Sequence, residues 1–347
     1  MSRDATLPLL PTTVVGAHGR PSWLHTAKAE IARGAYGPID TQEALDDAVE
    51  IAILDQTRAG IDVITDGEMR REGFLATFAG RITNLRNVGP LRKVGEVGLD
   101  MEPVLETTGR VEVPLGMGIV EEFEYLKAHT AKPIKVTCPG PYALTAYIRP
   151  VEGYRSRREL AEAFVPAINA ELRRLVAAGA TFIQIDEPAI SGVDVAPTPP
   201  ADMVALFNQA VEGVQAKLAL HICFGTYRKM PYAPRTYAPY VPALRDARAD
   251  HLVLEFANRL MAEIELWPEL GGDRELGAGV IDVRNWYVET PEEVAALIRQ
   301  ALKYVPADRL YLNPDCGLRR QARWVGYQKL HALAAGAAIV RRELTGQ

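Results

Sequence analysis

The chain alternates eight times between short apolar segments and helix-like segments, and this alternation constrains the fold more than any other feature. Each apolar segment is followed by a polar or Gly/Pro turn, which is typical of buried strands. Strands of a parallel sheet that is covered on both faces appear as such continuous apolar runs. The eight segments cover residues 12–16, 63–67, 134–139, 182–188, 218–225, 251–256, 278–283 and 310–314.

Helical patterns separate most of these segments and indicate how the sheet is arranged. We expect Thr41 to cap the first long helix and Pro166 to kink or interrupt the second. Eight strand–helix units predict a closed (β/α)8 barrel, and an open doubly wound sheet is the alternative. No Gly-x-Gly-x-x-Gly fingerprint follows the first strand to favour that alternative. The expected helices cover residues 41–59, 156–178, 290–304 and 324–344.

The chain contains no linker-like tract, so residues 1–347 are expected to form one catalytic barrel domain. The irregular stretch 81–127 is the exception to the strand–helix alternation. Its Val/Thr/Glu alternation near 108–113 predicts a small hairpin inserted after the second strand.

Composition excludes several classes of function. The net charge is -5 and the basic residues are spread along the chain, which does not suggest nucleic-acid binding. No apolar run reaches the roughly 18 residues that a membrane span requires, and residues 1–11 do not resemble a signal peptide. Three cysteines do not suggest a disulfide framework, so we expect a reducing cytoplasm, where thiols are free for metal or nucleophilic chemistry.

Polar and metal-binding residues recur where the predicted strands end. The carboxyl ends of barrel strands meet at one mouth, where barrel enzymes place their active sites. Buried charges are costly unless they are paired or bind a ligand, so this repetition indicates a functional mouth. The residues in question are His18, Arg20, Asp66, Glu68, Asp186, Glu187, His221, Cys223, Glu255, Asp282, Arg284, Asp315 and Cys316.

Four of these residues predict a metal site: His221, Cys223, Glu255 and Cys316. His221 and Cys223 are two residues apart, so in a strand both side chains point to one face. Two thiolates, an imidazole and a carboxylate form a tetrahedral zinc site, and sulfur disfavours Mg²⁺, Ca²⁺ and Mn²⁺. The alternative for Glu255 is an ion pair with an arginine such as Arg259. Zinc with sulfur ligands favours activation of a thiol for alkylation over hydrolysis.

These residues, with three motifs around them, resemble the cobalamin-independent methionine synthase family. The motifs are Asp-Gly-Glu at 66–68, Gln-Ile-Asp-Glu-Pro-Ala at 184–189 and Asn-Pro-Asp-Cys-Gly-Leu at 313–318. The chain looks like the short core form, which has only the catalytic barrel. The resemblance implies one Zn²⁺ held by the four ligands and methyl transfer to the thiol of homocysteine. It also implies that Asp186 and Glu68 bind the amino acid.

Three positions depart from the family pattern. Ala17, within Gly16-Ala17-His18, replaces a serine that contacts homocysteine, Tyr147 stands for a tryptophan of the folate site, and Arg284 replaces a histidine that acts as proton donor. We therefore assign substrate-binding roles to Gly16, Ala17, Glu68, Tyr147 and Asp186, and catalytic roles to Asp186, Arg284 and His18.

Three functions follow. The first is methionine synthesis from homocysteine, with a methylated corrinoid protein as the expected donor and methyltetrahydrofolate as the less favoured one. The second is alkylation of another thiol such as coenzyme M, since His18, Arg20 and Arg284 would suit a sulfonate; their alternative role is salt bridging to nearby rim carboxylates. The third is a non-catalytic zinc-binding barrel, against which the rim carboxylates argue.

Overall fold

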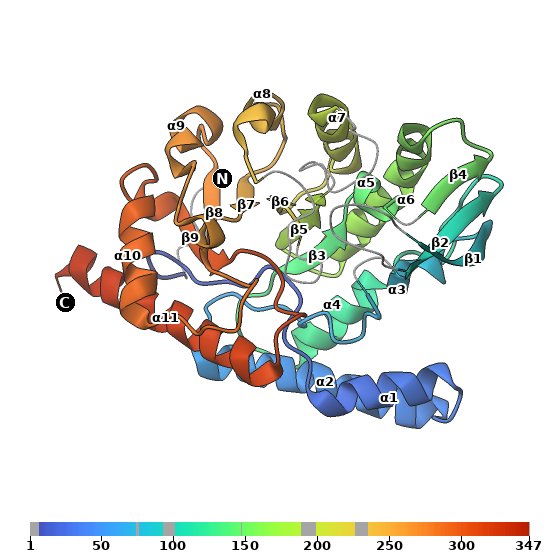
Figure 1. Cartoon of the computed structure of the whole chain (residues 1–347), viewed down its shortest axis with the longest axis horizontal. Helices are drawn as coiled ribbons and strands as arrows, with labels where there is room; N and C mark the ends of the chain where they lie inside the picture. The colour runs from blue at the N-terminus through green and yellow to red at the C-terminus, as the bar shows by residue number, and fades with distance from the viewer. Residues whose placement is uncertain are drawn as a thin grey trace.

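The computed structural model describes residues 7–73, 76–92, 101–146, 148–188, 199–225 and 235–346. Its centre is a parallel sheet whose six strands lie in the order β3-β5-β6-β7-β8-β9. The strands are β3 (Val136–Pro139), β5 (Phe182–Asp186), β6 (Lys217–Ile222), β7 (His251–Leu254), β8 (Glu275–Ile281) and β9 (Leu310–Pro314). Helices surround them on the outside (Figure 1).

The first two predicted strands close this sheet into a ring. Thr12 forms a parallel bridge with Leu312 of β9, Thr13 forms one with Val63, and Ile64 forms one with Ile134, just before β3. Eight segments therefore follow one another around a closed (β/α)8 barrel, as the sequence predicted. The strands end close to the predicted positions, although β8 begins three residues earlier than expected, at Glu275.

All four predicted helices are present, with changes at their ends. Thr290 caps α10 in a capping box with Glu293, and Ser156 caps α6. The prediction that Thr41 caps a helix is wrong, because α2 begins at Pro38 after the N-cap residue Gly37; proline at the first turn is preset for a helix. The helices are α1 (Ser22–Ala32), α2 (Pro38–Ala59), α3 (Ala76–Ala79), α4 (Ile119–Ala128), α5 (Pro141–Leu144), α6 (Arg157–Ala177), α7 (Pro200–Ala210), α8 (Val241–Arg245), α9 (Trp267–Leu270), α10 (Pro291–Ala301) and α11 (Arg323–Thr345), with 3₁₀ turns η2 (Ala238–Tyr240), η3 (Ala257–Arg259), η4 (Ile264–Leu266) and η5 (Ala307–Arg309).

Helix α6 also runs through Pro166 without a break, so the predicted interruption is wrong. Proline removes one backbone donor from a helix. The buried face of α6, which includes Leu160, Phe164, Ile168 and Leu172, offsets that loss by packing against the core.

The predicted insertion after the second strand is present and contains a hairpin. Strands β1 (Leu85–Arg92) and β2 (Met101–Thr108) pair antiparallel, and β4 (Ile148–Glu152) extends this small sheet by pairing parallel to β2. It lies to one side of the barrel (Figure 1). The hairpin was predicted near residues 108–113 but lies earlier in the chain, since its second strand, β2, already ends at Thr108.

The barrel interior contains both apolar and charged side chains. Its apolar cluster comprises Leu7, Val15, Val63, Phe182, Ala219, Val253 and Tyr311. Towards the amino ends of the strands, the interior also contains the buried Lys135 and His251. No helix within the described residues is long and apolar enough to cross a membrane.

Candidate metal centre

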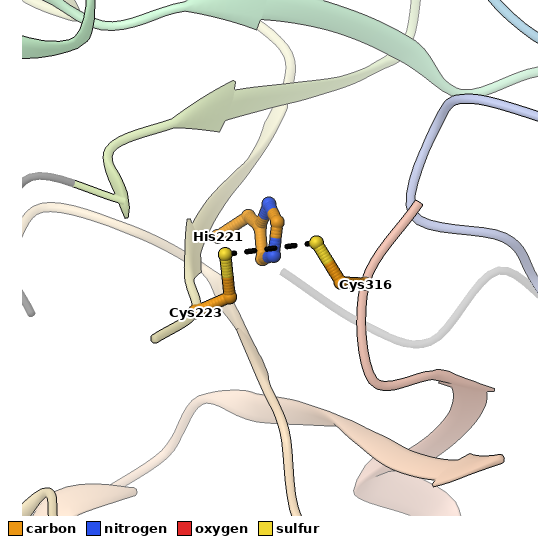
Figure 2. A group of neighbouring side chains, drawn as sticks. All are labelled: His221, Cys223 and Cys316. Carbon is orange, nitrogen blue, oxygen red and sulfur yellow. Dashed lines mark hydrogen bonds between the residues drawn. The ribbon is translucent and has the colours of Figure 1, made fainter. Parts of the chain in front are cut away.

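Three of the four predicted zinc ligands meet at the carboxyl end of the barrel. His221 lies in β6, Cys223 follows the end of that strand, and Cys316 follows the end of β9. Their candidate ligand atoms all lie within 4.8 Å of one another, and the two sulfur atoms are 3.6 Å apart. Figure 2 shows the imidazole facing the space between the two thiols. Parallel strands bring these residues together because they all end at the same mouth.

The imidazole of His221 is held by a chain of hydrogen bonds. Its Nδ1 lies 2.8 Å from Oδ1 of Asp186, and the same oxygen accepts a hydrogen bond of 2.7 Å from Nε2 of Gln184. Nε2 of Gln184 also donates to the carbonyl of Val15 at 2.7 Å. This arrangement fixes the tautomer that leaves Nε2 of His221 available as a ligand. Among the described residues, Nε2 has no hydrogen-bond partner, although it is buried.

The electrostatics of the three side chains favour a bound cation. Burial alone would lower the pKa of His221, but Asp186 and the negative charge of Cys316 raise it to about 10. The hydrogen bond between the sulfur atoms lowers the pKa of Cys316 and raises that of Cys223, because the pair shares one proton. The group therefore gathers negative charge around the free imidazole nitrogen.

The donor set fits zinc. Two thiols and one imidazole are the ligand types that zinc selects, and calcium and magnesium prefer oxygen. The buried Nε2 of His221, which lacks a hydrogen-bond partner, is the group that a metal ion would satisfy. Three protein ligands with one further position are the usual composition of a catalytic zinc site.

Glu255, the fourth predicted ligand, lies beside this group but is engaged elsewhere. Nη2 of Arg284 contacts its two carboxylate oxygens at 2.7 and 2.9 Å. The alternative of an ion pair with Arg259 is not observed, since Arg259 pairs with Glu263 at 2.6 Å. Glu255 therefore forms the ion pair that was expected as the alternative to metal binding, but its partner is Arg284.

Asp315 ties the segments that carry Glu255 and Cys316 together. Its carboxylate accepts hydrogen bonds from the backbone amides of Phe256, Ala257 and Asn258 at 2.8 to 2.9 Å, and from Nδ2 of Asn258 at 2.7 Å. Gly279 makes room for it, because a Cβ there would lie 2.2 Å from Oδ1 of Asp315. The aspartate before Cys316 therefore fixes the position of the cysteine and of the loop that follows β7.

The predicted substrate residues Gly16 and Glu68 lie together across the barrel mouth. Glu68 is buried, accepts from Thr137 at 3.1 Å and pairs with Arg319 at 2.8 Å. A Cβ on Gly16 would lie 2.6 Å from Oε1 of Glu68, so a larger residue there would displace this carboxylate. Glu68 has φ 52, and a left-handed backbone in a residue other than glycine is typical of functional positions.

The remaining predicted residues take other positions. His18 lies 3.1 Å from Asp55 of α2 and is not part of the His221 group. Ala17 is buried against Gly317, one residue after Cys316. Tyr147 lies outside the described residues. Arg20 donates to the backbone carbonyls of Arg71 and Glu72, so its hydrogen bonds go to the backbone and not to the rim carboxylates that were predicted as partners.

The sequence reasoning did not identify Gln184, Arg319 or Asn258. Gln184 could have been found, because it precedes Asp186 by two residues and therefore points to the same face of β5. Arg319 lies on a loop and Asn258 in the short 3₁₀ turn η3, where no long periodic pattern fixes the direction of a side chain.

Comparison with known proteins identifies the family. The profile of the family described as "Cobalamin-independent synthase, Catalytic domain" matches residues 10–338. A methionine synthase from Saccharolobus solfataricus is 39% identical over 342 residues, which cover 97% of this chain and 97% of that protein. The chain belongs to this family. A methionine synthase from Sulfurisphaera tokodaii is 36% identical over 343 residues, covering 97% of this chain and 94% of that protein.

A solved member of the cobalamin-independent methionine synthase family has the same fold. The structure of a B12-independent methionine synthase from a Shewanella species, in complex with selenomethionine, matches with a TM-score of 0.83 and 30% identity. The match covers 98% of this chain and all of that one (100%). The resemblance and the short core form are thus confirmed, and the chain is a methyltransferase of methionine biosynthesis.

Proposed function

We propose that this chain is a single-domain, zinc-dependent enzyme that transfers a methyl group to the thiol of homocysteine and so forms methionine. The observation that carries the proposal is the buried group of His221, Cys223 and Cys316, whose ligand atoms converge within 4.8 Å. The relatives named methionine synthase and the selenomethionine complex of the Shewanella protein support the choice of thiol.

Zinc would be held by His221, Cys223 and Cys316, with Glu255 as the predicted fourth ligand. When bound, zinc lowers the pKa of a coordinating thiol so that it is a thiolate at neutral pH. Asp186 orients His221 through the 2.8 Å hydrogen bond at Nδ1. Asp186 lies within the mouth as a buried carboxylate, and the second role proposed for it is to receive the ammonium group of the amino acid.

Glu68 is proposed as the other carboxylate for that ammonium group. Burial alone would raise the pKa of Glu68, but Arg71 and Arg319 lower it, so Glu68 is ionised. Gly16 lies beside this carboxylate, and Gly16 and Ala17 are the proposed substrate contacts next to it. Tyr147 stays a predicted contact of the donor. Arg284 places a positive charge near both thiols, and His18 anchors the loop after the first strand through Asp55. Their catalytic roles stay predictions.

Methyltetrahydrofolate is the donor that we now favour. The family is described as cobalamin-independent, which does not support the expected preference for a corrinoid protein. The thiol alkylation alternative with coenzyme M is disfavoured because Arg20 and Arg284 already donate to carbonyls and to Glu255. In the proposed reaction, the sulfur–carbon bond forms as the methyl–nitrogen bond of the donor breaks, and the thiol proton leaves to the donor nitrogen.

The test is a metal analysis followed by a donor comparison. Purified protein should contain about one zinc per chain. It should methylate homocysteine with methyltetrahydrofolate, and activity with methylcobalamin alone would replace the donor but keep the acceptor. Absence of zinc together with absence of methionine formation from either donor would contradict the proposal. Opening of an epoxide by coenzyme M would establish the second function instead.

A further inference from the structure

Arg319 lies on the loop between β9 and α11, and its guanidinium reaches Glu68 at the barrel mouth. Its Nη2 lies 2.8 Å from Oε2 of Glu68. The loop is tied to the segment that follows the first barrel strand, because the amide of Leu318 donates to the carbonyl of Ala17 at 2.7 Å. Arg319 is therefore held beside the proposed substrate contacts Gly16 and Ala17.

The two carboxylate oxygens of Glu68 have different surroundings. Oε1 accepts from the hydroxyl of Thr137 at 3.1 Å and lies 3.3 Å from Nη1 of Arg71. Arg71 is itself buried and pairs with Glu122 at 2.8 Å, so this side of Glu68 is fixed. Among the described residues, Oε2 is paired only with Arg319, whose side chain is 19% exposed. A substrate therefore meets Glu68 on the side of Oε2 and Arg319.

The guanidinium of Arg319 has hydrogen-bonding capacity left over. Its Nη1 is buried and has no hydrogen-bond partner within the described part of the chain. Ala17 offers a methyl group and no acceptor in its side chain. A second cation, Arg20, lies close by: burial and the charge of Arg319 lower the pKa of Arg20 to about 10, against smaller effects of Glu72 and Glu68. The surroundings of Arg319 therefore suit an anion.

The ion pairs of Glu68 also decide which ligand it can bind. Glu68 is already paired with two cations, Arg71 and Arg319. A lone ammonium group at Oε2 would meet the like charge of Arg319. An α-amino acid carries a carboxylate on the same carbon atom as its ammonium group, so the carboxylate can pair with Arg319 while the ammonium pairs with Glu68. Arginine is well suited to this role, because its planar guanidinium matches a carboxylate.

We infer that Arg319 binds the α-carboxylate of the amino acid substrate and so restricts the site to ligands that carry both an ammonium and a carboxylate group. This inference rests on the proposed function, because it uses Glu68 as a partner of the ammonium group. Arg319 contacts the substrate and sets specificity, whereas Arg71 is a positioning residue that keeps Glu68 in place.

The test compares the binding of methionine with that of methylthiopropylamine, which is methionine without its carboxylate. Isothermal titration calorimetry measures both ligands with the wild type, Arg319→Met and the control Arg320→Met, which changes the next residue, an exposed arginine. The wild type should bind methionine at least about tenfold more tightly than the amine, as expected for hydrogen bonds between charged groups. Arg319→Met should lose this preference through weaker binding of methionine, with the affinity for the amine unchanged or higher. Arg320→Met should keep the preference.

A purely structural role of Arg319 gives a different result. If Arg319 only held Glu68 in place, Arg319→Met would weaken the binding of both ligands by the same factor and the preference would stay, which would overturn the inference. Equal affinity of the wild type for both ligands would also overturn it, and that measurement needs no variant to fold. A wild type that binds neither ligand would contradict the proposed function, and this inference with it.

A crystal structure of the wild type with methionine provides the direct check. An oxygen of the methionine carboxylate should lie within about 3.2 Å of a guanidinium nitrogen of Arg319, the range of a hydrogen bond. A complex in which methionine is bound and its carboxylate has no contact with Arg319 would overturn the inference and leave the proposed function in place.

Discussion

Oδ1 of Asp186 lies 2.8 Å from Nδ1 of His221, and this contact decides which nitrogen of the imidazole faces the two thiols. A carboxylate behind a metal-binding histidine fixes the ring and raises its basicity. We expect Asp186→Ala to weaken the zinc Kd by about 10- to 100-fold, measured by chelator competition. Asp186→Asn keeps an oxygen acceptor and should lose less. An unchanged Kd in the alanine variant would show that Asp186 does not orient the ligand.

Cys316→Ser should remove zinc binding and activity while the barrel stays folded. Cys316 follows β9 and contributes one of only two sulfur atoms to the group, which are 3.6 Å apart. Cys138→Ser is the matched control, because Cys138 is buried and its sulfur contacts the carbonyl of Pro139. Zinc content by elemental analysis and far-UV circular dichroism check both variants. Full zinc content in Cys316→Ser would exclude Cys316 as a ligand.

Lys135→Met should stabilise the protein at neutral pH. Lys135 is fully buried, and Nζ has no hydrogen-bond partner among the described residues. Burial lowers the pKa of Lys135 from 10.5 to about 7, and Asp186 opposes this shift with a smaller effect. The buried Lys135 therefore costs no stability above about pH 10.5. As the pH falls from there towards 7, the free energy of unfolding decreases, because the unfolded state binds a proton and the folded state resists protonation. One pKa unit corresponds to about 1.4 kcal/mol, so replacing Lys135 by methionine should remove a penalty of a few kcal/mol at pH 7.

Urea unfolding at pH 7 and pH 9.5 measures this effect, and the gain should be smaller at the higher pH. Lys217→Met is the contrasting variant, since Lys217 pairs with Glu275 and donates to the hydroxyl of Tyr311 at 2.9 Å. It should destabilise the protein. A Lys135→Met protein that is less stable than the wild type at pH 7 would contradict the prediction.

The barrel could be predicted because its strands are continuous apolar runs that end in polar residues. Periodicity also placed His221 and Cys223 on one face, and the rule that strand ends share one mouth brought Cys316 to them. The extra strand β4 was not predicted, because it belongs to the small sheet of the insertion and follows no barrel repeat.

The side-chain pairing at the mouth could not be read from the sequence. Glu255 is placed beside both the metal group and Arg284, and only the three-dimensional positions show which of them its oxygens contact. The identity of a partner depends on loop conformation, as in Arg319 with Glu68, and loop conformation has no repeating pattern. Residue type and spacing therefore predicted the group of ligands but not the ion pairs around it.

The free energy of unfolding should fall as the pH drops from 6.5 to about 4, because of His251. This histidine is fully buried at the amino end of β7, and its Nδ1 lies 3.1 Å from Glu275. Burial lowers its pKa from 6.5 to about 4, against the smaller effect of Glu275. Because the folded pKa is depressed, the stabilisation is complete above pH 6.5 and is lost as the pH falls to about 4; the loss is about 3 kcal/mol. His251→Gln keeps a donor for Glu275 but does not titrate. Between pH 6.5 and 4, its free energy of unfolding should therefore fall by about 3 kcal/mol less than that of the wild type. Urea unfolding of the metal-free proteins measures it, with the exposed His331→Gln on α11 as the control that keeps the wild-type slope. Equal slopes in the wild type and His251→Gln would show that His251 does not govern this loss.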